Sequence, residues 1–313
     1  MRFPRLAFCL LALLAGTVSA ADRAPKIGVL LKGRGGFWGP IEKGARDAGA
    51  KAGAEIIFKA PPSETDIGVQ MQMLNALIGQ DVDAIIIAPN SRETLSLPIA
   101  SAAVKGIKIV VVDTQLAGKA ASVFIGTDHN AAGTAAGKLL ATLVNDNDEV
   151  CILKHSQTSG ATTARETNAL AAFREIHPKN VVHAEIYASA EAGTEIEKAR
   201  LLLSSHPNTK AILASGTPGT MAMLRVLQEK NLAGSIKLIG FGFNLNADAA
   251  AAIESGALSG WIAQQPNEIG VNAVNTALQL IKGEPVPPTL FTDVIVVTKE
   301  NLKTPKVQAL LNL

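Results

Sequence analysis

The sequence predicts an α/β protein built from two similar, doubly wound lobes, each with a parallel sheet between layers of helices. Short apolar runs alternate with amphipathic segments from residue 26 onward. Most of the runs are continuously apolar, as strands are when helices cover both faces of a parallel sheet. About ten such runs in 313 residues, 48% of them hydrophobic, are too many for one simple doubly wound domain.

The first residues, 1–20, form a separate segment. A basic start is followed by an apolar run over Leu6–Ala15 and by small residues that end in Val18-Ser19-Ala20. This pattern predicts a cleaved secretory signal peptide, and the alternative, a membrane anchor, would need an apolar run of about 20 residues. No lipobox precedes Cys9, so a lipoprotein is not expected. We therefore expect the mature protein, residues 21–313, to be exported to the periplasm.

The composition of the mature chain excludes several kinds of protein. Loss of Arg2 and Arg5 lowers the 29 basic residues to 27, which equals the 27 acidic ones. A nucleic-acid binder that works through phosphate contacts would carry a basic excess. Only Cys151 remains of the two cysteines, and its apolar surroundings predict a small buried hydrophobe. One cysteine supports neither a disulfide framework nor a multi-cysteine metal site.

The expected strands follow the apolar runs along the chain. They are Ile27–Leu31, Glu55–Phe58, Ala84–Ala88, Ile107–Val112, Val123–Ile125, Val150–Leu153, Val181–Ile186, Ala211–Ala214, Ile236–Phe241 and Trp261–Ala263.

The segments between the runs have helical character. In Asp66–Gln80, apolar residues recur at spacings of three and four, which marks one face of a helix: Ile67, Met71, Leu74 and Ile78. Gly39-Pro40 opens the first helix, where proline removes no hydrogen bond. The same template fits Thr162–Ile176, Thr194–Ser205, Thr220–Asn231 and Glu268–Lys282, and Gly283 stops the last of these. The alternation of strands and helices predicts right-handed crossovers.

The ligand site is expected beyond the carboxyl ends of the strands, where open parallel sheets bind their ligands. Aromatic and polar residues that follow the runs make up the candidate set: Phe37, Trp38, Asn90, Asp113, Thr114, Arg165, Asn244 and Gln264. Flat apolar faces together with planar hydrogen-bonding groups suit a sugar or polyol. The alternatives are core packing for the two aromatic residues, a turn or helix cap for Asp113, and a helix salt bridge for Arg165.

Enzymatic and metal sites have weaker support. Gly33-x-Gly35 begins like a dinucleotide fingerprint, but Trp38 stands in place of the third glycine. There is no phosphate-binding loop of the P-loop type and no nucleophile elbow. The five histidines lack zinc-site spacing and are expected to be scattered over the surface. We therefore predict no catalytic residues, no cofactor and no metal.

A set of motifs in a specific order resembles the type I periplasmic solute-binding proteins of ABC importers, in the ribose-binding-like branch. The matching pieces are Phe37-Trp38, Ala84–Asn90, Val110–Asp113, Ile125–Asp128, Ala164–Glu166 with Phe173, Ile239–Phe241, Ile262–Pro266 and Val294–Leu302. The resemblance runs from about residue 26 to residue 302.

The resemblance implies two lobes joined by a three-segment hinge, with the ligand held between them. The N-terminal lobe would be residues 25–126 plus 265–287, and the C-terminal lobe residues 127–264 plus 288–313. The third crossover would fall near Pro287–Thr292, and the hinge would include Thr127, Asp128, Gln265 and Pro266. The expected partners are a small solute and an inner-membrane ABC permease, and a monomer is expected.

Several positions depart from the ribose-type pattern. Gly35, Thr114, Gly216-Thr217 and Gly242 stand where that pattern has larger polar residues. Ribose itself is therefore not favoured over another monosaccharide, a polyol or another small polar solute, and Lys32 and Arg34 leave room for a weakly anionic one. The alternative function is a periplasmic sensing accessory that docks a sensor kinase or chemoreceptor. A transcription regulator would need a DNA-binding segment where the leader stands, and an exported enzyme lacks a catalytic set.

Overall fold

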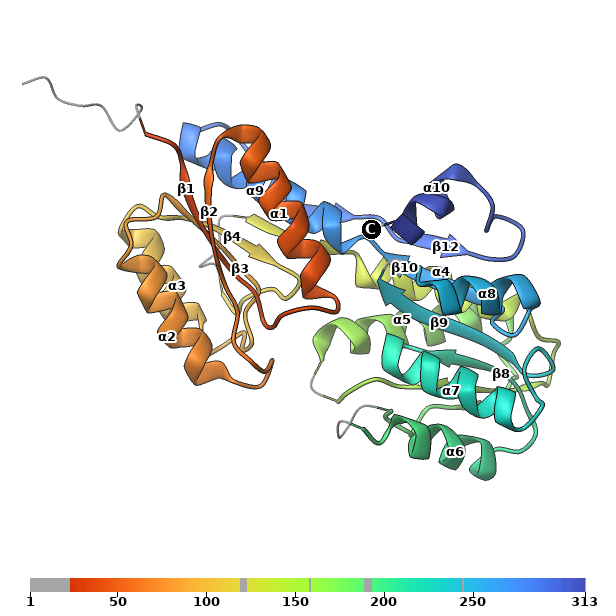
Figure 1. Ribbon diagram of the computed structural model, residues 1–313. Coiled ribbons are helices and arrows are strands. Elements are labelled where there is room, and N and C mark those ends of the chain that lie inside the picture. The colour runs from red at the N-terminus through yellow and green to blue at the C-terminus, as the bar shows by residue number, and fades with distance from the viewer. Residues whose placement is uncertain (1–22, 119–122, 158, 189–192, 244, 313) are drawn as a thin grey trace, which may run out of the picture.

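The computed structural model describes residues 23–118, 123–157, 159–188, 193–243 and 245–312. The predicted signal peptide, residues 1–20, and the candidate ligand residue Asn244 lie outside the described residues. Two six-stranded sheets organise the chain into two lobes that lie side by side in Figure 1. The predicted α/β class with two doubly wound sheets is confirmed.

The first sheet is parallel throughout and has the strand order β11-β5-β4-β3-β1-β2. Its strands in chain order are β1 (Lys26–Leu30), β2 (Glu55–Lys59), β3 (Ala84–Ile87), β4 (Lys108–Val112), β5 (Val123–Thr127) and β11 (Thr289–Thr292). The central strand β3 is fully buried along its length, which explains its continuous apolar run.

The second sheet has the order β12-β10-β9-β8-β6-β7, and only β12 runs antiparallel to its neighbour. Its strands in chain order are β6 (Glu149–Leu153), β7 (Val182–His183), β8 (Thr209–Ala214), β9 (Lys237–Phe243), β10 (Gly260–Gln264) and β12 (Ile295–Val297). The predicted strand over 181–186 is reduced to the two residues of β7.

Helices cover both faces of both sheets. On the first sheet, α1 (Trp38–Ala52) and α9 (Pro266–Lys282) share one face, and α2 (Ile67–Ile78) and α3 (Ser96–Val104) share the other. On the second, α6 (Glu195–Ser205), α7 (Thr217–Glu229) and α8 (Ala247–Ser255) oppose α4 (His129–Ala141) and α5 (Gly160–Ile176). The last elements, α10 (Pro305–Gln308) and a 3-10 turn (Ala309–Asn312), pack on the second lobe.

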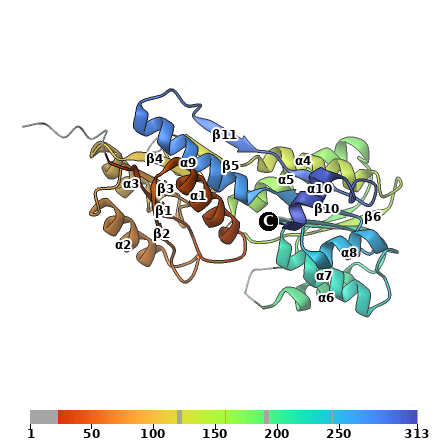
Figure 2. The same cartoon turned by 45° about the horizontal axis from the view of Figure 1, so that its top comes forward.

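The chain passes between the two sheets at three places. It leaves the first sheet after β5, returns after β10, and leaves again between β11 and β12. Although α9 comes late in the sequence, it lies beside α1 in the first lobe (Figures 1 and 2), where Asn267 Nδ2 donates to the Pro40 carbonyl at 3.4 Å. These passages are the three crossovers that the resemblance implied.

The predicted lobe boundary at residues 287 and 288 needs one correction. Strand β11 was assigned to the C-terminal lobe, but it pairs in register with β5, Leu290 opposite Ile125, and so extends the first sheet. The third passage therefore lies at residues 293–294, after β11 rather than before it. The reason is that β11 covers the otherwise free edge of β5.

The buried face of α2 also differs from the predicted one. Gln70, Leu74 and Leu77 are buried, whereas Met71 and Ile78 are only partly so. The buried stripe is thus rotated by about one residue from the predicted face, and a glutamine lies within it.

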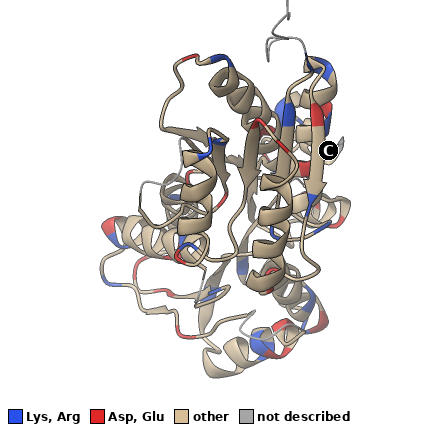
Figure 3. Ribbon diagram, turned by 90° about the vertical axis from the view of Figure 1, so that its left-hand side faces the viewer, with Lys and Arg blue, Asp and Glu red and all other residues tan. Residues whose placement is uncertain are grey.

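Two smaller expectations concern Cys151 and surface charge. Cys151 is fully buried, and its burial raises the pKa of the thiol to about 11, so the predicted apolar role is confirmed. Basic and acidic segments are interspersed over the described residues (Figure 3), which fits the absence of a basic stripe in the sequence. None of the helices in the described part of the chain is long and apolar enough to span a membrane.

Candidate functional site

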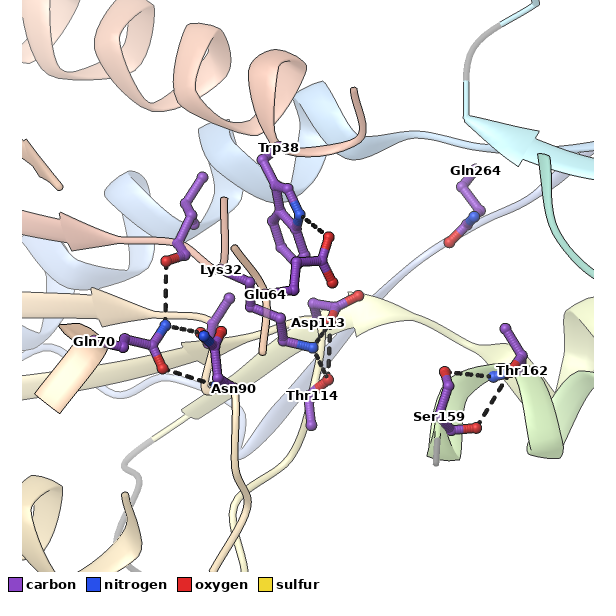
Figure 4. A network of polar contacts seen from close by, with 12 residues as sticks. Lys32, Trp38, Glu64, Gln70, Asn90, Asp113, Thr114, Ser159, Thr162 and Gln264 are labelled. Carbon is purple, nitrogen blue, oxygen red and sulfur yellow. Dashed lines mark hydrogen bonds and ion pairs between the residues drawn. The ribbon is translucent and has the colours of Figure 1, made fainter. Parts of the chain in front are cut away.

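The candidate site lies between the two lobes, where the carboxyl ends of both sheets bring polar side chains together. The first lobe contributes residues that follow β1, β3 and β4, and the second contributes residues from α4, α5 and the end of β10. Figure 4 shows the first-lobe network on one side, with Gln264 and the start of α5 facing it from the other.

An ion pair forms the centre of the first-lobe half. Lys32 Nζ lies 2.8 Å from Asp113 Oδ2 and donates to Thr114 Oγ1 at 2.7 Å, while the Thr114 hydroxyl donates to the same carboxylate oxygen at 2.8 Å (Figure 4). The side chains of Lys32 and Asp113 are only 15% and 14% exposed. The three residues therefore satisfy one another in a closed triangle at the ends of β1 and β4.

Backbone geometry and charge both specify Asp113. Its φ is 63°, in the left-handed region that aspartate and asparagine tolerate better than other side chains. Burial raises the pKa of its carboxyl, but the charge and hydrogen bond of Lys32, with smaller help from His129 and Thr114, outweigh burial, and the pKa is lowered. Asp113 is thus a carboxylate at neutral pH, and it accepts hydrogen bonds but donates none.

A buried glutamine supports Asn90. Gln70 Nε2 donates to the carbonyls of Leu31 and Ala88, at 3.1 and 2.7 Å, and so connects the ends of β1 and β3. Its Oε1 accepts from the Asn90 backbone N–H at 2.8 Å (Figure 4). The Asn90 side-chain oxygen and nitrogen are both buried and have no hydrogen-bond partner among the described residues.

The aromatic pair at the first turn divides into two roles. Trp38 is 6% exposed, belongs to the first-lobe core, and donates from Nε1 to Glu64 at 2.6 Å. Phe37 is only partly buried, and its ring contacts Trp38 edge-on, with centroids 5.1 Å apart, and Phe243 of the second lobe, 5.8 Å apart. These contacts favour core packing for Trp38 and an interlobe position for Phe37.

Arg165 is the centre of the second-lobe half. It is 6% exposed and donates to three neutral acceptors: His129 Nδ1 at 3.2 Å, the Ser215 carbonyl at 3.1 Å and Gln264 Oε1 at 2.8 Å. Its guanidinium also lies 5.0 Å from the centre of the Phe241 ring. Burial lowers the pKa of the guanidinium to about 10, which leaves it charged at neutral pH. The sequence left open a salt bridge between Arg165 and a neighbour on its own helix. Instead, Arg165 contacts His129 of α4, Ser215 after β8 and Gln264 of β10.

His129 is held in one protonation state by Arg165. Because Nδ1 accepts from Arg165 Nε, the neutral ring carries its hydrogen on Nε2. Burial, followed by the Arg165 charge, lowers the pKa of this histidine to about 3. Nε2 is buried and has no partner among the described residues, so His129 holds an unpaired N–H donor.

A second carboxylate organises the backbone behind Arg165. Glu166 is 5% exposed, and its Oε1 accepts from the His155 backbone N–H at 3.0 Å and from the Ser215 hydroxyl at 2.6 Å. His155 Nδ1 is another buried atom without a hydrogen-bond partner in the described part of the chain. Burial, followed by Arg165, lowers the pKa of His155. The expectation of surface histidines is therefore wrong for His129 and His155.

Close packing of α4 on α5 sets the distance between His129 and Arg165. A Cβ at Gly133 would collide with the Arg165 carbonyl, and a Cβ at Gly137 would collide with the Ala169 carbonyl. Two glycines one turn apart on α4 thus let its backbone contact that of α5. This approach brings the first residue of α4 within hydrogen-bonding distance of Arg165.

The predicted hinge residues lie at two of the passages between lobes. Thr127 ends β5 and donates to Gln264 Oε1 at 3.3 Å, while Asp128 caps α4 by accepting from the N–H groups of Asn130 and Ala131. Gln265 donates from Nε2 to the Asp293 carbonyl at 3.0 Å and so connects the second passage to the third. Pro266 is the first residue of α9.

Comparison with known proteins decides the family. The family described as "Periplasmic binding protein domain" matches residues 27–285. The chain belongs to this family. The predicted resemblance is thus confirmed, and as a member of a family of binding proteins the chain holds its solute without converting it.

The periplasmic binding proteins most useful for comparison are sugar receptors. A D-allose-binding periplasmic protein of Escherichia coli is 26% identical over 260 residues, which are 80% of this chain and 83% of that protein. A carbohydrate transporter solute-binding protein of Agrobacterium radiobacter, solved with D-arabinose, is 28% identical, with a TM-score of 0.83 over 93% of this chain and all of that one. A receptor of Agrobacterium vitis, solved with D-fucose, is 26% identical, with a TM-score of 0.82 and coverage of 91% and 99%.

Two departures from the ribose-type pattern have a packing cause in this binding protein. A Cβ at Gly242 would collide with the ring of Trp261, which is fully buried on the neighbouring strand β10. A Cβ at Gly216 would come within 2.9 Å of His155 Nδ1. Bulky groups on adjacent elements therefore occupy the space that side chains at these two positions would need.

Sequence reasoning missed Glu64 and Gln70 and took His129 and His155 for surface residues. Gln70 could have been found as a polar residue four and seven positions before the buried Leu74 and Leu77 on one helix face. Glu64 lies in a loop, and no local pattern marks it. Each histidine lies two residues after the end of a strand, β5 or β6, and that position is the signal that could have identified them.

Proposed function

We propose that this periplasmic binding protein captures a neutral monosaccharide between its lobes and delivers it to an ABC permease. The observation that carries the proposal is a set of buried polar atoms that have no hydrogen-bond partner among the described residues. They belong to Asn90 in the first lobe and to His129 and His155 in the second. Buried polar atoms are nearly always paired in folded proteins, so unpaired ones at the carboxyl ends of the strands mark a ligand site.

The chemistry of these atoms matches sugar hydroxyls. Asn90 offers one acceptor and two donor hydrogens, and His129 offers one donor. Asp113 and Arg165 add an acceptor from one lobe and a donor from the other, and Gln264 lies beside Arg165. A hydroxyl both donates and accepts, so a ring with several hydroxyls can satisfy all these groups at once. Two of the solved relatives hold sugars of this kind, D-arabinose in one and D-fucose in the other.

The distribution of charge favours a neutral solute. Lys32 is neutralised by Asp113, and Arg165 lies next to the buried carboxylate of Glu166 in the sequence. The charges of Asp113 and Glu166 act on the Arg165 guanidinium without an ion pair to it among the described residues, so the two cations and two carboxylates balance in number. An anionic ligand would add an unbalanced negative charge. Contacts from both lobes would favour the closed arrangement, in which the chain segments at Thr127, Asp128, Gln265 and Pro266 act as the hinge.

Export and delivery complete the proposal. Residues 1–20 would direct the chain to the periplasm and be removed there, and the closed, sugar-loaded protein would dock on the permease as a monomer. Sequencing the N-terminus of protein isolated from the periplasm tests the leader, and a first residue of Ala21 is expected. An uncleaved chain in the membrane fraction would contradict it.

The sugar assignment is tested by calorimetry on residues 21–313, unfolded and refolded to remove co-purified solute. The panel is D-arabinose, D-fucose, D-allose, D-ribose, inositol, amino acids and small organic acids. We expect micromolar binding, about −8 kcal/mol, for at least one sugar, with a smaller radius of gyration in small-angle scattering. Binding of an amino acid or organic acid alone would overturn the sugar assignment.

A matched pair of variants tests the site. Asn90→Ala removes a buried amide without a partner, whereas Asn75→Ala removes an exposed amide from α2. Asn90→Ala is expected to weaken sugar binding at least tenfold, about 1.4 kcal/mol, and Asn75→Ala to leave it unchanged. Equal affinities in the two variants would place the sugar elsewhere.

A further inference from the structure

Two histidines and a glutamate meet on the second lobe, where His206 lies 21 residues after Glu185 in the sequence and close to it in space. The rings of His183 and His206 stack with their centroids 3.7 Å apart and their planes at 17°. His206 Nε2 lies 2.6 Å from Glu185 Oε1. One potential ligand atom from each of the three residues lies within 4.8 Å of the other two. The absence of zinc spacing in the sequence therefore did not exclude a three-residue ligand set.

Ends of regular elements position these side chains. His183 is the last residue of β7, and Glu185 follows two positions later, so both can project to the same side of an extended chain. His206 directly follows α6. A fourth group, the Glu149 carboxylate at the start of β6, lies 3.7 Å from His183 Nε2. The backbone at β6 and α6 is thus held by the sheet and by helix packing before any ligand binds.

The group has the composition of a transition-metal site. Imidazole nitrogen and carboxylate oxygen are common ligands of Zn²⁺, and imidazole also suits Cu²⁺ and Ni²⁺. Ligand atoms about 2.0–2.1 Å from a tetrahedral zinc are about 3.3 Å apart, which is longer than the 2.6 Å contact of His206 with Glu185 and shorter than the 4.8 Å within which all three ligand atoms lie. Glu185 is 57% exposed and can rotate to adjust these distances, and His183, at 28%, leaves the metal a path from solvent.

The cluster is remote from the sugar site. Glu149 begins β6 and His183 pairs with Cys151 at the middle of that strand, whereas His155 follows its carboxyl end. The five residues of β6 span about 16 Å. Figure 1 shows α6 beginning on the side of the first lobe and ending away from it, where His206 follows. A ligand here would contact none of the groups assigned to the sugar.

We propose that His183, His206 and Glu185 form a binding site for a divalent transition metal of the zinc class, with Glu149 as an additional carboxylate ligand or as a hydrogen-bond acceptor for His183. The metal joins β7, a strand of two residues, to the end of α6.

The histidine at the end of α5 provides the matched control. His177 also contacts a carboxylate, with Nδ1 2.7 Å from Asp146 Oδ1, but its Nε2 already contacts the Ala141 carbonyl at 3.0 Å. It resembles His206 in its carboxylate contact and does not share its neighbouring imidazole. His177→Gln therefore changes a histidine–carboxylate pair without changing the cluster.

The test is calorimetric titration of tag-free, EDTA-treated protein, residues 21–313, with ZnCl₂ at pH 7.5. We expect one equivalent to bind, and we expect His183→Gln and His206→Gln each to weaken binding at least tenfold while His177→Gln has no effect. Absence of zinc binding, or equal affinity in His206→Gln and His177→Gln, would overturn the proposal.

Two further measurements separate this site from the sugar site. Cobalt(II) should give a visible absorption spectrum of tetrahedral nitrogen and oxygen coordination in the wild type and not in His206→Gln. Sugar affinity should be unchanged in all three variants, so a failure of metal binding with intact sugar binding would overturn only the metal proposal. Parallel circular dichroism of each variant shows whether its fold is retained.

Discussion

The two halves of the candidate sugar site hold their charges in different ways. In the first lobe, Lys32 and Asp113 neutralise each other at 2.8 Å. In the second, Arg165 is buried more deeply, at 6% exposure, and donates to His129, Ser215 and Gln264, all of them neutral acceptors. The ion pair of the first half is thus satisfied within its own lobe, whereas the second half uses a cation to hold three segments of chain together.

This difference predicts that the two halves respond differently to substitution. Loss of a first-lobe group should affect the ion pair or the core beneath it, while loss of Arg165 should affect the ligand and several segments at once. Arg165 reaches the starts or ends of α4, β8 and β10.

Trp38→Ala should destabilise the first lobe more than any other substitution considered. The ring is 6% exposed within the first-lobe core, so its removal leaves a cavity, and the free energy of unfolding should fall by about 3–5 kcal/mol. Urea unfolding measures this change when it is monitored by the backbone circular dichroism signal, which does not depend on tryptophan fluorescence. Phe291→Ala, at an aromatic residue that is 50% exposed, is the control and should cost less than about 1 kcal/mol. A similar small cost at Trp38 would contradict its assignment to the core.

Arg165→Ala should cause the largest loss of sugar affinity. It removes a buried charged donor and leaves the Ser215 carbonyl without this bond, so we expect binding to weaken by about 1.5–3 kcal/mol, roughly ten- to 150-fold. Calorimetry with the best sugar from the panel measures the change. Arg174→Ala, on the same helix but exposed, is the control. Wild-type affinity in Arg165→Ala would remove the second half from the site.

Asp113→Asn tests whether the first half depends on charge. Asparagine tolerates the φ of 63° and still accepts hydrogen bonds, but it cannot neutralise Lys32. Sugar binding should weaken by about 1.5 kcal/mol, roughly tenfold. Asp81→Asn makes the same change at an exposed aspartate with a φ of 52° and should have no effect. Unchanged affinity in Asp113→Asn would favour the turn role that the sequence left open.

The sequence predicts most of the sheet framework because buried parallel strands are apolar on both faces. It predicts less of the helices: α4 buries Ala132, Gly133, Ala136 and Gly137 rather than large apolar residues, so its stripe escapes a search for hydrophobic periodicity. Helix α8, rich in alanine, was missed for the same reason. The edge strands are the hardest elements to predict from the sequence, because a short strand needs only a few pairing residues.

The candidate site follows the same division. Asp113, Arg165 and Gln264 could be proposed from the sequence because each was expected near the carboxyl end of a strand, which the order of apolar runs indicates. Trp38 was assigned to a binding wall, but it lies in the first-lobe core. Its burial depends on how α1 packs on the sheet, which no local sequence pattern encodes. The meeting of His183 and His206 depends on pairing of β7 with β6, which no local spacing encodes.

The pH dependence of stability should distinguish His129 from the ionised groups of the first half. Burial lowers the pKa of His129 to about 3, below the value of about 6.5 in an unfolded chain. The unfolded state therefore binds an extra proton as the pH falls from 6.5 toward 3, and stability is lost over that range. At pH 5.5 the loss from this group should be on the order of 1 kcal/mol relative to pH 8.

His129→Asn removes this titration while keeping an acceptor for Arg165. Urea unfolding at pH 8 and pH 5.5 should show a difference in unfolding free energy that is smaller in His129→Asn than in the wild type. His177→Asn is the control with the opposite sign, because its contact with Asp146 raises the pKa of that histidine, so His177 stabilises the protein more at low pH. If His129→Asn kept the full pH dependence of the wild type, the ring would titrate normally, and its Nε2 would not be the fixed donor that the second half of the site requires.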